Sequence, residues 1–242
     1  MANLNKKCLI IDSSGVRPFV FAVKNLSLNF KKFEEFSDHF DIFIGDSLLL
    51  NGEFSFSYGN QQSIFTSPIN PVQLTNFPLQ NFSIVLSDAG YLSQTINKKS
   101  KFSFNISKIE VDVNQRRILW DSSPHWDFLS DRDKDIISLA YQKNKTYDEV
   151  AVLTNDWHLR QQCLEFEGIS TYGSCSMLAG AVLTGFITYQ QGTYIYSGWL
   201  KEEPKWIPYA KNEYGFKRKL KFREVLEIER WRIKNNESFW IS

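Results

Sequence analysis

Cysteine and histidine are scarce in this chain of 242 residues, with three of each. Cys8, Cys163 and Cys175 lie far apart in apolar surroundings, a pattern typical of reduced core thiols in a cytosolic protein. The histidines are also scattered along the chain. The sequence therefore gives no support to a disulfide framework, a zinc site, or catalysis by a cysteine or histidine nucleophile.

Long apolar runs and excess charge are missing as well. No run of about 18 apolar residues occurs, and the longest apolar run near the N-terminus covers residues 8–11, so we expect no membrane span, no signal peptide and a cytoplasmic location. The chain has 28 basic and 27 acidic residues, so nucleic-acid binding would need a local basic patch. A hydrophobic content of 43% is sufficient for the core of one large domain or of a domain with an appendage.

Two predicted strands each end in an aspartate. Residues 8–11 form a short apolar run that stops at Asp12, and residues 150–154 form another that stops at Asn155 and Asp156. The carboxyl ends of parallel strands meet at one edge of a sheet, where ligands usually bind. We expect Asp12 and Asp156 to converge there, although Asp12 taken alone would equally suit a turn or a cap.

A third aspartate is expected from a helix at 129–142. Ser130 suits the N-cap, and Asp133 then shares a face with Ile136 and Ile137, which we expect to be buried. An acid on that face, near the two strand-end acids, predicts an acidic cup that attracts a divalent cation, because unpaired buried charge is costly. Ligands that are all oxygen favour Mg²⁺ or Mn²⁺ over zinc.

The middle of the chain predicts a β-rich segment. The clearest signal is a hairpin in which Asn51-Gly52 separates the runs 41–50 and 53–58. Residues 82–86 have the composition of a further strand, and residues 89–96 that of a short helix. We therefore expect a β-rich elaboration to interrupt an α/β frame.

Helices are expected at 157–167 and 177–186, on either side of a strand at 169–172. Residues 189–199 are aromatic and resemble a strand, and residues 216–235 predict a helix.

Lys and Arg supply most of the affinity for nucleic acid by releasing counterions from phosphates. The candidate phosphate contacts near the last helix are Lys217, Arg218, Lys219, Lys221 and Arg223. An ordinary solvated helix that packs on the domain is the alternative interpretation.

Several of these segments together resemble the PIN-domain nucleases. They are the strand before Asp12, the helix 129–140, the sequence LTNDWHLR at 153–160, and the small-residue helix that ends in Gly-Phe-Ile at 185–187. The resemblance implies an α/β fold, a three-layer α/β/α sandwich with a central parallel sheet. On this basis residues 1–188 form the PIN-like domain with a β-rich insertion at about 41–113, and residues 189–242 form an aromatic and basic C-terminal extension.

The resemblance also implies a metal-dependent endonuclease that cleaves phosphodiester bonds with Mg²⁺ or Mn²⁺, most often in single-stranded RNA and less often in DNA. Asp12, Asp133 and Asp156 match the catalytic, metal-binding aspartates of the family, and Thr154 and Asn155 match polar residues beside the last acid, which we expect to contact nucleic acid. Proteins of this kind include toxins and defence effectors, for which a cognate inhibitor protein is expected. The oligomeric state is left open, with a dimer as one option.

One departure from the family concerns a fourth acid, usually a glutamate early in a middle helix. The corresponding residues 84–94 contain no glutamate, and Asp88 is the nearest substitute as a metal ligand. A non-catalytic PIN-like module that binds a partner protein or nucleic acid therefore stays open as the alternative. Residues 129–151 also resemble the first helices of helix-turn-helix proteins, but a strand follows them where a recognition helix is needed.

Overall fold

The computed structural model describes residues 7–15, 17–26, 40–45, 54–55, 72–73, 82–86, 105–108, 126–211 and 217–240. Asp88, the turn at Asn51-Gly52 and the helix expected at 89–96 lie outside these residues. Within the described ranges, none of the helices combines the length and the apolar character needed to cross a membrane.

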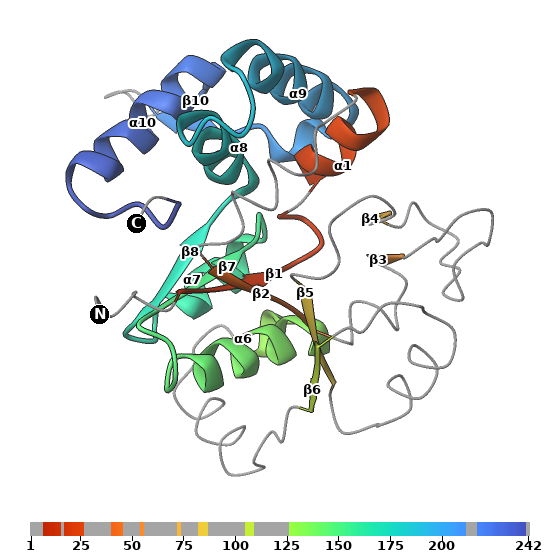
Figure 1. The fold of residues 1–242 in the computed structure, drawn as a ribbon, viewed down its shortest axis with the longest axis vertical. Helices are drawn as coiled ribbons and strands as arrows, with labels where there is room; N and C mark the ends of the chain where they lie inside the picture. The colour runs from red at the N-terminus through yellow and green to blue at the C-terminus, as the bar shows by residue number, and fades with distance from the viewer. Residues whose placement is uncertain are drawn as a thin grey trace.

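A six-stranded parallel sheet forms the centre of the fold (Figure 1). The strand order is β6-β5-β2-β1-β7-β8, and each neighbouring pair is parallel. The strands at its middle are continuous apolar runs, as expected of strands that are covered on both faces. The bounds are β1 Lys7–Ile11, β2 Phe40–Gly45, β5 Phe82–Leu86, β6 Asn105–Lys108, β7 Glu149–Leu153 and β8 Ile169–Tyr172.

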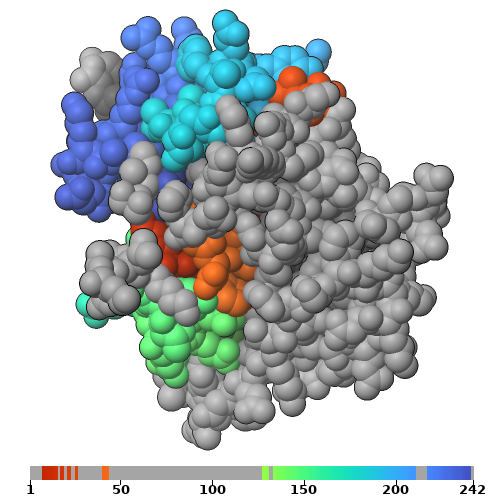
Figure 2. All heavy atoms as spheres, viewed as in Figure 1, coloured from red at the N-terminus to blue at the C-terminus, as the bar shows by residue number. Residues whose placement is uncertain are grey.

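Helices lie on opposite sides of this sheet in Figure 1, with α6 below it and α1, α8, α9 and α10 above it. Helix α6 contacts β1, β2 and β7, whereas α8 contacts α1, α9 and α10. Figure 2 shows the red and orange atoms of β1 and β2 between the green atoms of α6 and the blue atoms of α10. The bounds are α1 Arg17–Asn25, α6 Asp131–Lys143, α7 Trp157–Cys163, α8 Ser174–Leu183, α9 Tyr189–Glu202 and α10 Phe222–Lys234.

Smaller elements complete the described chain. Short 3-10 helices precede α6 and follow α9, at η2 Trp126–Phe128 and η3 Pro204–Trp206. Strands β9 Tyr209–Lys211 and β10 Lys217–Lys219 pair antiparallel, and β3 Phe54–Ser55 and β4 Val72–Gln73 pair parallel.

The last described residues pack against the sheet. Phe239 and Trp240 are 1% exposed, and both rings contact Phe40 of β2 and Tyr172 of β8. Lys7, at the start of β1, donates from Nζ to the Phe239 carbonyl oxygen at 3.1 Å. Residues from the predicted extension therefore share one core with the sheet, while the division at residue 188 stays a prediction.

The predicted α/β fold with a parallel sheet is confirmed, whereas the described parts of the two predicted hairpin runs, β2 and β3, do not pair with each other. Strand β2 pairs with β1 and β5, and β3 pairs with β4. Ile42 and Phe43, which point to opposite faces of β2, are both buried, so this strand suits the interior of a sheet better than a hairpin with one solvated face. The strands β2, β5 and β6 from the predicted insertion thus belong to the central sheet.

Two predictions for the C-terminal residues are wrong. Residues 189–199 form most of helix α9, because Gly192, Ile195, Tyr196 and Trp199 recur at helical spacing and are buried, and Thr188 caps the helix. The basic run 217–219 is strand β10, and the helix begins only at Phe222. Aromatic β-propensity was outweighed here by packing against α1 and α8.

Candidate active site

Asp12 follows β1 directly and is buried. Its backbone N–H donates to the Leu153 carbonyl oxygen at 3.0 Å, which continues the pairing of β1 with β7. Its carboxylate Oδ2 accepts from the Thr154 hydroxyl at 2.7 Å and from the Ser14 hydroxyl. The strand pairing and these two hydroxyls together fix the position of the acid.

Asp156 is the N-cap of α7, and its Oδ1 accepts from the Leu159 N–H at 3.0 Å. Its own N–H donates to the Thr154 hydroxyl oxygen at 3.0 Å. The hydroxyl that donates to Asp12 therefore also accepts from Asp156, so one side chain connects both strand-end acids. Thr154 has no exposed surface and holds these two residues, while its predicted contact with nucleic acid stays a prediction.

Asp133 lies in the first turn of α6, where Ser130 is the N-cap, as predicted. Its Oδ2 accepts from the Ser130 N–H at 3.1 Å and from the Ser130 hydroxyl at 2.6 Å. Burial raises the pKa of Asp133 above 3.8, and the negative charges of Asp12 and Asp156 raise it further, against the opposing effect of the Ser130 hydrogen bonds. Asp12 and Asp156 are therefore both near enough to Asp133 to disfavour its ionised form.

A polar network behind the acids joins three loops. The Asn155 amide nitrogen donates to the Ser14 carbonyl oxygen at 2.9 Å, and its amide oxygen accepts from the Ser174 N–H at 3.0 Å. The Ser174 hydroxyl also donates to the Ser14 carbonyl oxygen at 2.9 Å. Asn155 thus connects the loop after β1 to the start of α8, while its predicted contact with nucleic acid stays a prediction.

Ser14 and Ser174 were not predicted as site residues. Both follow strands of the sheet by two or three residues, at the edge where the acids lie. Their position just after a parallel strand could have marked these two serines as site residues. Serine is so common in turns, however, that this signal is weak.

Two arginines lie beside the start of α8. The Arg160 side chain approaches the backbone of Gly173, the N-cap of α8. A Cβ atom added to Gly173 would lie 3.7 Å from Arg160 Nη1. The Arg232 guanidinium lies 5.5 Å from the centre of the Tyr172 ring and pairs with the buried Glu229 at 3.4 Å. Burial and the charge of Arg232 lower the pKa of Arg160, and among the described residues no carboxylate forms an ion pair with Arg160.

The three acids suit a hard divalent cation in their chemistry. Asp12 and Asp133 accept hydrogen bonds from described residues on Oδ2, and Asp156 accepts on Oδ1, so each retains a second oxygen. However, the described residues contain no group of three His, Cys, Asp or Glu side chains arranged to hold a metal ion. The ligand types fit Mg²⁺ or Mn²⁺, and their present arrangement is not a complete coordination site.

The predicted phosphate contacts lie elsewhere. Lys217, Arg218 and Lys219 are exposed on β10, which lies beyond α8 from the sheet in Figure 1. Arg218 donates to Glu224 at 2.8 Å, and Arg223 pairs with Glu227 at 3.1 Å, so nearby glutamates balance two of the five cations. The structure does not bring this basic group to the acids.

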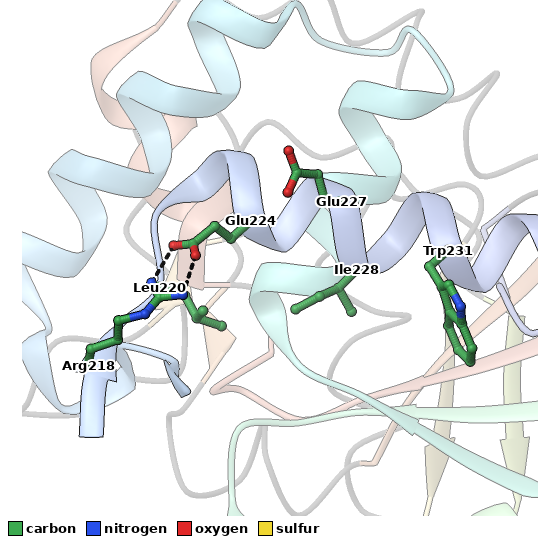
Figure 3. Close-up of a pocket in the computed structure, with 6 residues that line it drawn as sticks. All are labelled: Arg218, Leu220, Glu224, Glu227, Ile228 and Trp231. Carbon is green, nitrogen blue, oxygen red and sulfur yellow. Dashed lines mark hydrogen bonds and ion pairs between the residues drawn. The ribbon is translucent and has the colours of Figure 1, made fainter. Parts of the chain in front are cut away.

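A hollow of about 390 Å³ lies beside this basic group (Figure 3). Ile228 and Trp231 point to the same side of α10, and Arg218 and Glu224 close one end of the hollow with their hydrogen bonds. Its lining residues are Arg218, Leu220, Glu224, Glu227, Ile228 and Trp231. The hollow contains none of the three predicted catalytic acids.

Comparisons of the chain with protein-family models, with curated proteins and with solved structures find no match.

Proposed function

We propose that this protein is a metal-dependent endonuclease with a PIN-like, three-layer α/β/α arrangement, and that its substrate is single-stranded RNA. The observation that supports this most is the position of Asp12 and Asp156 after the adjacent parallel strands β1 and β7, with Asp133 in the first turn of α6. Burial raises the pKa of Asp133, and the charges of Asp12 and Asp156 raise it further. Carboxylates that are partly buried and repel one another destabilise a fold unless a cation neutralises them. Such an arrangement is expected of a site that functions with a bound metal.

The helices on opposite sides of the parallel sheet support the proposed architecture (Figure 1). The three acids lie where β1 and β7 end and where α6 begins, so one edge of the sheet presents them together. This is the edge at which open α/β folds usually bind ligands.

In the proposed reaction, Asp12, Asp133 and Asp156 would hold Mg²⁺ or Mn²⁺. A cation held there would activate a water and stabilise the negative charge that develops on the phosphate oxygens. Thr154 keeps Asp12 and Asp156 in register, since its hydroxyl bonds to both. Arg160 provides a positive charge for the phosphate, because it follows Asp156 by one helical turn.

The second candidate is a non-catalytic PIN-like module that binds a partner protein or nucleic acid. It is favoured by the missing glutamate in residues 84–94 and by the lack of a ready-made group of three metal ligands among the described residues. A toxin or defence role, with a cognate inhibitor, applies only to the first candidate.

The first prediction separates the two candidates through Asp156→Asn. Asparagine is also a good N-cap, so the variant should retain the bond to the Leu159 N–H and the melting temperature of the fold. Cleavage of single-stranded RNA with Mn²⁺ should fall by about 100-fold or more, since even an outer partner of a metal ligand contributes about 10- to 100-fold. The measurements are cleavage of RNA and DNA with Mn²⁺ and with chelator, and melting curves with and without metal.

Glu165→Gln is the matched control for this experiment, because Glu165 is an exposed acid just past the end of α7. It should cleave as the wild type does. If the wild-type protein cleaves nothing and Mn²⁺ does not change its melting temperature, the nuclease proposal is wrong and the non-catalytic module is the better description.

A further inference from the structure

Three aromatic side chains, Phe128, Trp157 and His158, form a cluster on the surface next to the acids; we call it the aromatic platform. Phe128 is 70% exposed and Trp157 is 60% exposed. The Phe128 and His158 rings are stacked, with centroids 5.6 Å apart and planes 17° apart. The Trp157 ring meets His158 edge-on, with centroids 5.0 Å apart.

The platform is attached to the two helices that present acids. Phe128 precedes the N-cap of α6 by two residues, and Asp133 is in the first turn of that helix. Trp157 and His158 are the first two residues of α7 and directly follow Asp156. The stack of Phe128 on His158 therefore connects the starts of α6 and α7, where Asp133 and Asp156 lie.

Large aromatic rings exposed in a group usually mark a binding surface, because a soluble protein otherwise covers them. A nucleobase suits such a group, since each base has a flat π-face that stacks on aromatic side chains without regard to sequence. Only an unpaired base can do so, because the faces of paired bases are already stacked within a duplex.

A pair of arginines, Arg160 and Arg232, lies at the start of α8. Arg160 follows Asp156 by four residues on α7 and approaches the start of α8, whereas the platform is on the side of α6. Arg232 Nη1 donates to the Ser176 hydroxyl at 3.4 Å in the first turn of α8, so both guanidinium groups lie at the start of this helix. A phosphodiester has the charge that matches two guanidinium groups and forms strong hydrogen bonds with them.

We propose that α7 carries the binding path of a single strand, in which an unpaired base stacks on Phe128, Trp157 and His158 and a neighbouring phosphate binds Arg160 and Arg232. Asp156 caps the helix that carries Trp157, His158 and Arg160, so both contacts are made beside an acid of the site. The identity of the ligand as a nucleic acid rests on the proposed nuclease function. The binding itself needs no metal, and the two can be tested separately.

The base contact is tested with Phe128→Ala in buffer containing a chelator, by fluorescence anisotropy of labelled RNA. The two probes are an unstructured RNA strand and an abasic strand of equal length. Because the variant lacks the ring on which the base stacks, it should bind the intact strand about 5- to 150-fold more weakly. Its binding of the abasic strand should be unchanged. Phe128→Tyr should retain the affinity, and Trp231→Ala, which removes an exposed ring from α10, is the matched control.

The phosphate contact is tested with Arg160→Gln. It should weaken binding of the intact and abasic strands alike, and reduce the slope of log affinity against log salt by about 0.7 for the one lost phosphate contact of a single strand. Arg230→Gln, which removes an exposed arginine from α10, is the control. If the site binds any phosphate, inorganic phosphate should raise the melting temperature of the wild-type protein more than that of Arg160→Gln. If the site requires a strand, inorganic phosphate should leave both melting temperatures unchanged.

Equal losses for intact and abasic strands in Phe128→Ala, or no loss in either, would overturn the aromatic platform. Unchanged salt dependence in Arg160→Gln would overturn the phosphate contact. If the variants change strand binding as proposed but the wild type shows no metal-dependent cleavage, the strand path is correct and the nuclease function is wrong. If the wild type binds no strand but self-associates, and Phe128→Ala abolishes self-association, the cluster is a protein interface and the proposal is wrong.

Discussion

Asp133 has two roles that act on stability in opposite directions. Its hydrogen bonds with Ser130 form the capping box of α6, which stabilises the helix start. Its burial and the charges of Asp12 and Asp156 make its ionised form less favourable in the folded protein than in the unfolded chain. A residue that was only a cap would not lie where two other acids repel it, so Asp133 is the most direct test of the site.

The prediction at this residue concerns pH. The folded-state pKa of Asp133 is raised above 3.8, so ionisation destabilises the fold at neutral pH, and this effect disappears as pH falls through the folded-state pKa. Asp133→Asn retains an acceptor for Ser130 and removes the charge, so it should melt above the wild type at pH 7. The difference in melting temperature between the two proteins should shrink as pH falls and vanish below about pH 3.8.

Melting curves of both proteins from pH 3 to pH 8 measure this, and Mn²⁺ at neutral pH provides a second arm. A cation should raise the melting temperature of the wild type and have little effect on the variant. A variant that melts below the wild type by the same amount at every pH would show that Asp133 serves the cap alone.

Single residues differed in how well the sequence predicted them. The positions of Asp12 and Asp156 followed from short apolar runs that stop at an acid, and the face of Asp133 followed from helical periodicity. The stack of Phe128 on His158 was not predictable, because it joins two elements that are separated in sequence by a helix and a strand. The periodicity of apolar residues in one element shows which of its faces is buried, but it does not show which other element that face contacts.

At the scale of elements, α8 depends on a glycine that faces the last described residues. A Cβ atom added to Gly180 would lie 2.5 Å from Trp240 Cγ and 2.9 Å from Trp240 Cβ. In an exposed helix, glycine to alanine stabilises by about 1 kcal/mol. Here Gly180→Ala should instead destabilise by about 1–3 kcal/mol, because the buried ring has to shift.

Urea unfolding of a double-mutant cycle measures this effect. In a Trp240→Ala background the steric clash is gone, so Gly180→Ala should become neutral or stabilising. The same loss of stability in both backgrounds would mean that α8 does not contact Trp240 as closely as described.

The elements that were predicted correctly have one clear period and recognisable ends. Strands β1, β7 and β8 and helix α6 are of this kind, since α6 has both an N-cap serine and a regular apolar face. Helix α9 was mistaken for a strand because its aromatic and threonine residues favour β structure when taken singly. The pairing of β2 was missed because a strand's partners depend on residues far away in the chain.

For the whole molecule, the shared core predicts cooperative unfolding. The core includes residues from β1, α6, α8, α9 and α10, together with Phe239 and Trp240. Trp240→Ala should therefore lower the stability of the whole fold by about 3–5 kcal/mol and retain a single transition by circular dichroism and by fluorescence. Trp231→Ala, which removes a ring that is 57% exposed, should change stability by about 0.5 kcal/mol or less. Two separate transitions would instead support an independent unit after residue 188.

The central place of β1 has a consequence for how the chain reaches its fold. Strand β1 is synthesised well before β7, one of its two partners. The bond of Ser14 with Thr154 joins residues 140 positions apart. At about 5–20 residues per second, a ribosome takes roughly 10–30 s to supply the missing strand. During this interval an apolar strand has an unpaired edge, so we expect the nascent chain to require chaperone protection and to fold slowly, as high contact order dictates. Asp12 meets Asp133 and Asp156 only when this interval ends, so a growing chain carries no assembled acidic site.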